Sequence, residues 1–195
     1  MNKTDIKHLS DEERTEAIAA HISEILTLLG EDSSRQGLLK TPLRAAKALR
    51  YLCSGYDIPP AGIMKEALFD NEGSRIVTVR DIEFYSMCEH HILPFFGKVS
   101  VAYLPDKHIV GLSKLARVTD ALAHRLQVQE RFTRQLCDEI LAATGAKGVL
   151  VKCTGEHMCM KMRGVEKQHA ATVTVEYNGD FAADPDLRRE ALALL

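Results

Sequence analysis

The sequence predicts an α+β protein whose core is a four-stranded antiparallel sheet. Helical periodicity dominates the first third of the chain and returns in the middle, while strand-like runs come in two pairs. Each pair is close enough in sequence to form an antiparallel hairpin, and two middle helices separate the pairs. At 195 residues the chain has the length of one ordinary domain with a small helical appendage. We expect an N-terminal helical region over residues 1–60 and a sheet-containing domain over residues 61–195.

The N-terminal region carries start signals for two helices. Ser10 and Glu13 have the spacing of a capping box, and apolar residues follow at helical intervals. Thr41-Pro42 reads as the N-cap and first residue of a second helix that ends near Gly55. Pro59-Pro60 is expected to break the chain after it.

The remaining elements follow from alternating and four-residue patterns. The four predicted strands are Arg75–Met87, Lys98–Tyr103, Gly148–Thr154 and Ala170–Tyr177. Ser113 is the expected N-cap of a helix that runs to about Leu126. A second middle helix starts near Val128 and stops at Gly145, and Asp184-Pro185 starts a short C-terminal helix.

Composition excludes several classes of protein. Hydrophobic residues make up 46% and charged residues 27%, as in a globular chain that can bury a large core. A net charge of −2 disfavours binding to nucleic acid, and no apolar run is long enough to span a membrane. The charged N-terminus differs from a signal peptide, so we expect a cytoplasmic protein. The odd count of five cysteines argues against a disulfide framework, and Cys53, Cys137 and Cys153 are expected to be small buried hydrophobes.

Two short clusters in the predicted strand connections concentrate the chemistry of the chain. Cys88-Glu89-His90-His91 lies in the first connection and His157-Met158-Cys159 in the second. Thiolate and imidazole ligands favour zinc, and Cys159 shares a side with His157 if the segment is extended. Spacing leaves open which imidazoles bind. Two thiolates and one imidazole would leave a position for water and other histidines for proton transfer, whereas the alternatives are a closed four-ligand site or cysteines without metal.

Several polar residues near these clusters could bind an anion or a base. The sequence contains no P-loop motif, but Lys114 and Arg117 lie at the start of a predicted helix, whose N-terminus attracts anions. Arg163 follows the second cluster. Glu130, next to Gln129, either compensates a helix dipole or accepts two parallel N–H bonds from a guanine edge.

Several motifs in one order resemble the GTP cyclohydrolase I family. The resemblance covers residues from about Leu38 to Phe181. The matching segments are Thr41–Arg44 with Ala46-Lys47, Cys88–His91, Gly111–Arg117, Arg125–Arg131 and His157–Val165. It implies the tunnelling fold (T-fold), in which sheets from several subunits close into a barrel. It also implies a homodecamer of two stacked pentamers with active sites between subunits.

The resemblance implies a zinc-dependent hydrolase that converts GTP and water to 7,8-dihydroneopterin triphosphate and formate. This reaction is the first step of pterin and tetrahydrofolate biosynthesis, within one-carbon metabolism. The implied Zn²⁺ ligands are Cys88, His91 and Cys159. The implied acid–base groups are His90 and His157. The implied GTP-binding residues are Gln129 and Glu130 for guanine, Ser113 near the ribose, and Lys114, Arg117, Arg163, Lys47 and Arg44 for the triphosphate.

Two other functions compete with this interpretation. A related tunnelling-fold enzyme would act on a pterin or a deazapurine, although such relatives generally lack this Cys–His–Cys combination beside triphosphate-binding residues. A non-catalytic oligomer stabilised by zinc would have four protein ligands and no turnover.

Overall fold

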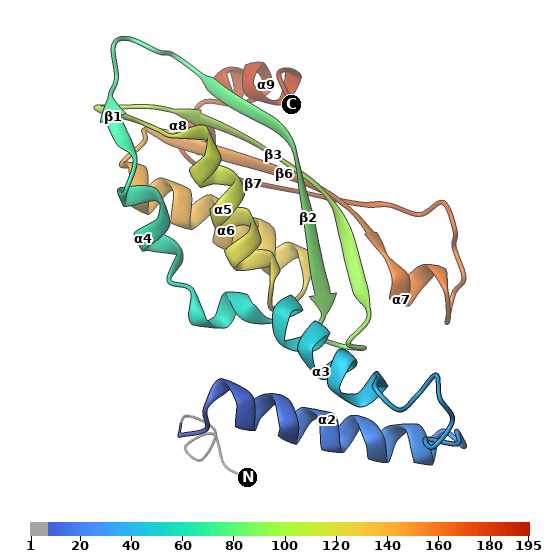
Figure 1. Ribbon diagram of the computed structural model, residues 1–195. Coiled ribbons are helices and arrows are strands. Elements are labelled where there is room, and N and C mark those ends of the chain that lie inside the picture. Colours follow the sequence, from blue (N-terminus) through green and yellow to red (C-terminus); the bar gives the residue numbers. More distant parts are fainter. Residues whose placement is uncertain (1–7) are drawn as a thin grey trace. The chain divides into compact units, whose positions relative to one another are not determined.

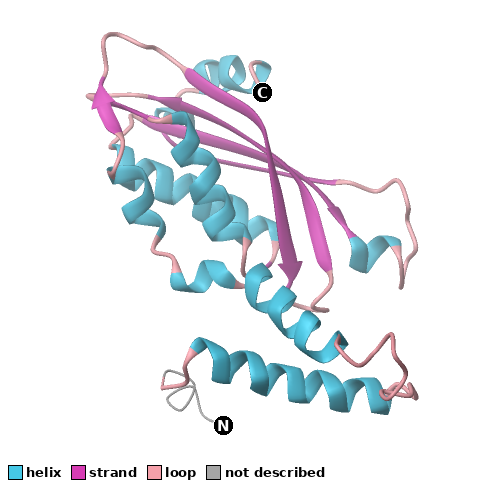
Figure 2. Cartoon of the chain, viewed as in Figure 1, coloured by secondary structure: helices cyan, strands magenta, loops and turns pink. Residues whose placement is uncertain are grey.

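The computed structural model describes residues 8–195 and divides the chain into two compact units, Met1–Leu52 and Cys53–Leu195. Helices and strands of the described residues are coloured along the sequence in Figure 1 and by type in Figure 2. Within residues 8–195, no helix is long and apolar enough to cross a membrane.

The first unit is a pair of helices, α2 (Asp11–Leu28) and α3 (Thr41–Leu52). The predicted capping box is confirmed, because Glu13 N donates to Ser10 Oγ while Ser10 N donates to the Glu13 carboxylate. Helix α3 begins at Thr41 itself and ends before Gly55, so both predicted boundaries were slightly wrong. Arg50 of α3 pairs with the Asp11 carboxylate at 2.6 Å and ties the two helices together.

The second unit opens with short helices where a chain break was expected. A 3-10 turn, η1 (Ser54–Asp57), precedes α4 (Pro60–Lys65). The predicted break is present at Pro59, whose extended backbone separates η1 from α4. The sequence did not predict that Pro60 begins a new helix, at the first position of which its missing N–H costs nothing.

Four long strands form an antiparallel sheet, as predicted. They are β2 (Val77–Cys88), β3 (Pro94–Leu104), β6 (Gly148–His157) and β7 (Thr172–Gly179). A fifth strand of two residues, β5 (Leu126–Gln127), pairs parallel to the end of β2, so the predicted count of four was one short. The order is β5-β2-β3-β6-β7, and the long strands twist strongly across the sheet (Figure 1). A separate two-stranded sheet joins β1 (Leu68–Asp70) and β4 (His108–Val110).

Helices α5 (Leu112–Ala123) and α6 (Gln129–Thr144) pack on one face of the sheet. The buried apolar core lies between them and the alternate strand residues that point to this face. The largest of these core side chains are Tyr103, Phe84, Phe95, Phe132, Leu115, Leu122, Leu136 and Ile140. The stop of α6 at Gly145 is confirmed by its left-handed φ of 62°. Ser113 is not the N-cap of α5, because Gly111 takes that position. The helix ends at Ala123, before the predicted end near Leu126.

The opposite face of the sheet is covered only in part. Helices α8 (Asp180–Ala183) and α9 (Pro185–Ala193) bury Ala102 and Leu150 of the sheet against Phe181 and Ala191. The predicted C-terminal helix is confirmed, since the Asp184 carboxylate caps α9. Other large side chains of the strands stay exposed: Tyr85, Val173, Val175 and Tyr177.

Strand register brings both chemical clusters to one end of the sheet. Phe95 at the start of β3 pairs with His157 at the end of β6, and Met87 at the end of β2 pairs with Pro94. The connections after β2 and β6 therefore lie at the same end, as the sequence predicted. The second connection opens with a helical turn, α7 (Met158–Lys161), so the segment through Cys159 is not extended and the condition for a shared side with His157 is not met.

Candidate active site

Three side chains that could hold a metal ion converge at this end of the sheet. Cys88 is the last residue of β2, His91 lies in the following turn, and Cys159 lies in α7. Their ligand atoms all lie within 4.8 Å of one another. Burial, and then the neighbouring Cys88 thiol, raise the pKa of Cys159. Two thiols this close without a cation disfavour each other's ionised form, and a bound cation reverses that preference.

The arrangement of these donors suits a tetrahedral metal ion. With bonds of about 2.3 Å to sulfur and 2.0 Å to nitrogen, tetrahedral geometry places neighbouring S and N ligands roughly 3.5 Å apart. Sγ of Cys88 and Nδ1 of His91 are 3.8 Å apart. Within residues 8–195 the group contains three protein ligands, the number found in catalytic zinc sites, which keep a fourth position open.

A pocket with a cavity volume of about 200 Å³ adjoins the two thiols. Six residues predicted from the sequence line it: Cys88, His90, Gln129, Glu130, His157 and Cys159. The other lining residues are Phe95, Gln127, Val128, Met160 and Thr172. Two histidines outside the Cys–His–Cys group, a carboxylate and an amide therefore line the same pocket as the two thiols of that group.

His157 is held flat against an aromatic ring. Its imidazole stacks on Phe95 with 4.8 Å between ring centroids and 2° between the planes. The β3–β6 register makes these two residues direct partners, so the sheet places the imidazole beside the Phe95 ring. Burial lowers the pKa of His157, while the nearby Glu130 carboxylate opposes that shift.

Gln129 is locked by hydrogen bonds on one side of its amide and unpaired on the other. Its Nε2 donates to the Thr172 carbonyl at 3.0 Å, to Thr174 Oγ1 at 3.1 Å and to the Cys153 carbonyl at 3.2 Å. Its Oε1 is buried and has no hydrogen-bond partner among the described residues. A buried acceptor without a partner is costly, so this oxygen is suited to accept an N–H group from a ligand.

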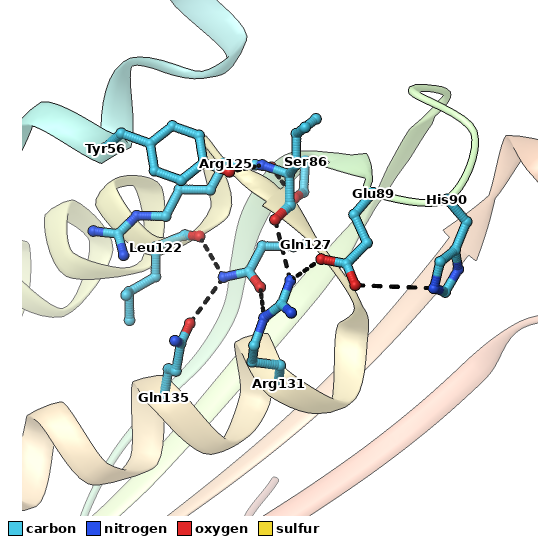
Figure 3. A network of polar contacts seen from close by, with 10 residues as sticks. Tyr56, Ser86, Glu89, His90, Leu122, Arg125, Gln127, Arg131 and Gln135 are labelled. Atoms are coloured by element: carbon cyan, nitrogen blue, oxygen red, sulfur yellow. Dashed lines mark hydrogen bonds and ion pairs between the residues drawn. The ribbon is translucent and has the colours of Figure 1, made fainter. Parts of the chain in front are cut away.

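A polar network lies behind the turn that carries the histidines (Figure 3). Arg131 of α6 pairs with the Glu89 carboxylate, and this hydrogen bond is the main cause that lowers the pKa of Glu89. Glu89 also lies 3.9 Å from His90 Nε2. Sequence reasoning missed both Glu89 and Arg131, because no local spacing links a residue after β2 to a residue in α6.

The structure places the predicted triphosphate residues outside the pocket of a single chain. Lys114 is nearly buried and donates to the Glu66 carboxylate at 2.6 Å. Arg117 lines a separate hollow that also contains Glu66. Ser113 precedes Lys114 in the first turn of α5 and does not line the pocket either.

The other predicted anion-binding residues lie in two places. Arg163 follows α7 and is near enough to Cys159 to favour its thiolate. Arg44 and Lys47 lie on α3 in the first unit.

The fold and the site together define an α+β protein whose pocket combines a Cys–His–Cys group that could hold a metal ion with further histidines and a carboxylate. A family model described as GTP cyclohydrolase I matches residues 18–195. This chain therefore belongs to the GTP cyclohydrolase I family.

Curated relatives match over most of their length. GTP cyclohydrolase 1 of Porphyromonas gingivalis (strain ATCC 33277) is 48% identical over 187 residues, which cover 96% of each chain. GTP cyclohydrolase 1 2 of Pseudomonas aeruginosa is 50% identical over 179 residues, covering 92% of this chain and 99% of the relative. GTP cyclohydrolase 1 of Parabacteroides distasonis is 52% identical over 167 residues, covering 85% of each.

Proposed function

We propose that this chain converts GTP and water to 7,8-dihydroneopterin triphosphate and formate, the first step of pterin and tetrahydrofolate biosynthesis in the cytoplasm. The observation that carries the proposal is the single pocket that joins the Cys–His–Cys group to two further histidines and to Gln129 and Glu130. Family membership and the names of the curated relatives support the same activity. Residues 61–195 would be the catalytic tunnelling-fold domain and residues 1–60 an N-terminal helical region.

Cys88, His91 and Cys159 would hold Zn²⁺. When bound, the ion would supply Lewis-acid chemistry and lower the pKa of water beside the substrate. Neutral imidazole and thiolate are ligands that zinc prefers, and the three donor atoms already lie within 4.8 Å of one another. Because the fold already orders these ligands, metal binding would require little rearrangement.

Gln129 and Glu130 would bind the guanine base. The Glu130 carboxylate can accept two parallel N–H bonds from the guanine edge. The unpaired Oε1 of Gln129 can accept another, and its fixed amide orientation selects N–H donors in preference to acceptors. Recognition through buried polar atoms discriminates strongly, because a wrong base leaves those atoms unpaired.

His90 and His157 would move protons during opening of the imidazole ring and the later closure of the pterin ring. C8 of guanine becomes a better electrophile when N7 is protonated, and a histidine with a pKa near neutral can supply that proton. His157 is held by Phe95, whereas His90 lies on an exposed turn, so the two imidazoles differ in mobility and can serve different stages.

A second copy of the chain would complete the site with residues that bind the triphosphate. Ser113, Lys114 and Arg117 do not line the pocket of their own chain, so in this proposal they serve a neighbour's pocket. Arg163 would act beside the pocket, and Arg44 with Lys47 would come from another subunit. Most of β2 and all of β7 have one unpaired edge in the described sheet, which supports closure into a barrel across subunits and a decamer of two pentamers.

The direct test is to incubate the purified protein with GTP, with and without a chelator, and to follow formate and dihydropterin absorbance. We expect formate only with metal, while His90→Ala and His157→Ala retain the metal and slow different stages. Turnover of a pterin or deazapurine without GTP activity would indicate the related tunnelling-fold enzyme. Absence of any formate from the metal-loaded protein would refute the proposed activity, and loss of metal from either histidine variant would refute the ligand assignment.

A further inference from the structure

We propose that Glu89 is a positioning residue for His90, and that Arg131 and Gln127 hold Glu89 in place. This inference rests on the proposed function, in which His90 transfers protons. Glu89, Arg131 and Gln127 do not themselves react in this proposal.

Arg131 gives the Glu89 carboxylate a fixed partner. Its Nη2 donates to Glu89 and to the Leu126 carbonyl at 3.2 Å, and its Nε donates to Gln127 Oε1 at 2.9 Å. The planar guanidinium is thus tied to three acceptors, which leaves little rotational freedom. The side chains of Glu89 and Arg131 are each 34% exposed, so water screens this pair less than a surface ion pair.

Gln127 in turn fixes Arg131 and the backbone of Glu89. It is 2% exposed, and its Nε2 donates to the Leu122 carbonyl at 3.0 Å and to Gln135 Oε1 at 2.9 Å. Those bonds orient the amide so that its Oε1 faces Arg131 (Figure 3). The Gln127 carbonyl also accepts the Glu89 N–H at 3.0 Å. One buried residue therefore sets both the backbone and, through Arg131, the carboxylate of Glu89.

His90 depends on this carboxylate for its orientation. Its side chain is 64% exposed, so core packing does not hold the imidazole. Among residues 8–195, the charged group paired with His90 is the Glu89 carboxylate, whose Oε1 lies 3.9 Å from His90 Nε2 (Figure 3). That distance exceeds a direct hydrogen bond, and one bridging water or a small closure on substrate binding would complete the contact. A carboxylate that orients the imidazole of an acid–base group is a recurrent arrangement in enzymes.

A rival explanation is that the Glu89–Arg131 pair only stiffens the turn that carries Cys88 and His91. The two explanations differ in what they predict when His90 is absent. If Glu89 acts through His90, its replacement has no effect in a chain that lacks His90. If it holds the metal-binding turn, the same replacement weakens metal binding and slows the reaction in either background.

The test is a double-mutant cycle of Glu89→Gln and His90→Ala on the full-length, metal-loaded protein. Formate release is followed both at steady state over a range of GTP concentrations and in single turnovers with enzyme in excess. Metal content and the Co²⁺ absorption spectrum are recorded for each variant. We expect Glu89→Gln to lower kcat about 10–100-fold, the usual cost of losing a group that orients an active side chain. KM for GTP, metal content and the Co²⁺ spectrum should stay unchanged, and the double variant should match His90→Ala.

Equal losses in both backgrounds, or a changed Co²⁺ spectrum in Glu89→Gln, would overturn the proposal. If His90→Ala releases no measurable formate, the reaction intermediates that accumulate in the two variants are compared. The proposal requires Glu89→Gln to accumulate the same intermediate as His90→Ala, and a different intermediate would refute the positioning role of Glu89. Glu83→Gln, which removes a carboxylate from β2, the strand that precedes the turn of Glu89, is the matched control and should keep wild-type kcat. No formate from the wild type would instead refute the proposed function, so the two failures are distinguishable.

Discussion

Replacement of Gly97 with alanine tests how closely β3 and β6 must approach beside the pocket. An ideal Cβ at Gly97 would lie 2.0 Å from the Thr154 carbonyl oxygen and 2.9 Å from the Gly155 Cα. Ordinary contact begins at 3.4 Å, so the first distance is more than 1 Å too short. Both neighbours are backbone atoms of β6, and no side-chain rotation can relieve the overlap. The two strands must therefore separate.

The cost follows from the bonds that such a separation breaks. Loss of two ladder hydrogen bonds at about 1 kcal/mol each, with strain of about 1 kcal/mol or more, gives a destabilisation of about 3 kcal/mol. For a chain of this size that corresponds to a fall in Tm of roughly 6–12 °C. Phe95 and His157 form a pair on the same ladder, so the imidazole loses its fixed position and activity should fall below what the unfolded fraction explains.

Thermal unfolding followed by circular dichroism, at one fixed protein concentration, measures this effect. Gly62→Ala is the matched control, because its Cβ would have no atom within 4 Å and the residue lies in α4. Alanine in a helix is favoured over glycine by about 0.5–1 kcal/mol, so the control should be neutral or stabilised. A Gly97→Ala variant with wild-type Tm and wild-type activity would refute the reasoning.

Three further predictions concern the metal site, the core and the buried thiols. Cys159→Ser should lose most bound Zn²⁺ by elemental analysis while Cys53→Ser keeps it, and equal retention would contradict the ligand set. Phe132→Ala removes a fully buried ring and should lower the free energy of unfolding, measured with denaturant, by about 3–5 kcal/mol. Phe69→Ala removes an exposed ring and should lower it by less than about 0.5 kcal/mol. Burial raises the pKa of Cys137 to about 12 from 9.0, so its contribution to stability is complete below pH 9 and is lost as pH rises from 9 towards 12. Cys137→Ala should flatten that decline in alkaline unfolding experiments, and an unchanged slope would contradict it.

The sequence predicted the long elements of the fold well, because their signals are local and repeated. Gly145 ends α6 through its left-handed conformation, and Asp184 caps α9, as their positions indicated. Strands β1, β4 and β5 were missed because two or three residues carry no periodicity. Helix α4 was missed because proline both breaks a chain and begins a helix, and only tertiary packing decides whether a helix follows it.

The candidate site was predicted unevenly, for a physical reason. Spacing identified Cys88 and Cys159 as thiols of two clusters but left the choice of imidazole open, since that choice depends on side-chain direction in the folded turns. The structure brings the His91 imidazole to the thiols, while His90 and His157 line the pocket. The roles of these residues in the reaction remain predictions. Contacts such as Glu89 with Arg131 join distant segments, so no reading of one segment could find them.

Strand register links the stability of the sheet to the chemistry of the pocket. Cys88 is the last residue of β2, and Cys159 lies in α7, directly after β6. Strands β2 and β6 are not neighbours in the sheet, and β3 pairs with both. A slip of one residue between β3 and β6 would turn the His157 side chain to the opposite face, away from Phe95, and would displace α7 with Cys159. The proposed metal binding by this group would therefore require the native register of three strands. A variant that folds with a shifted register should keep its helices yet fail to bind zinc, which makes metal content a more sensitive measure of the native sheet than helical content.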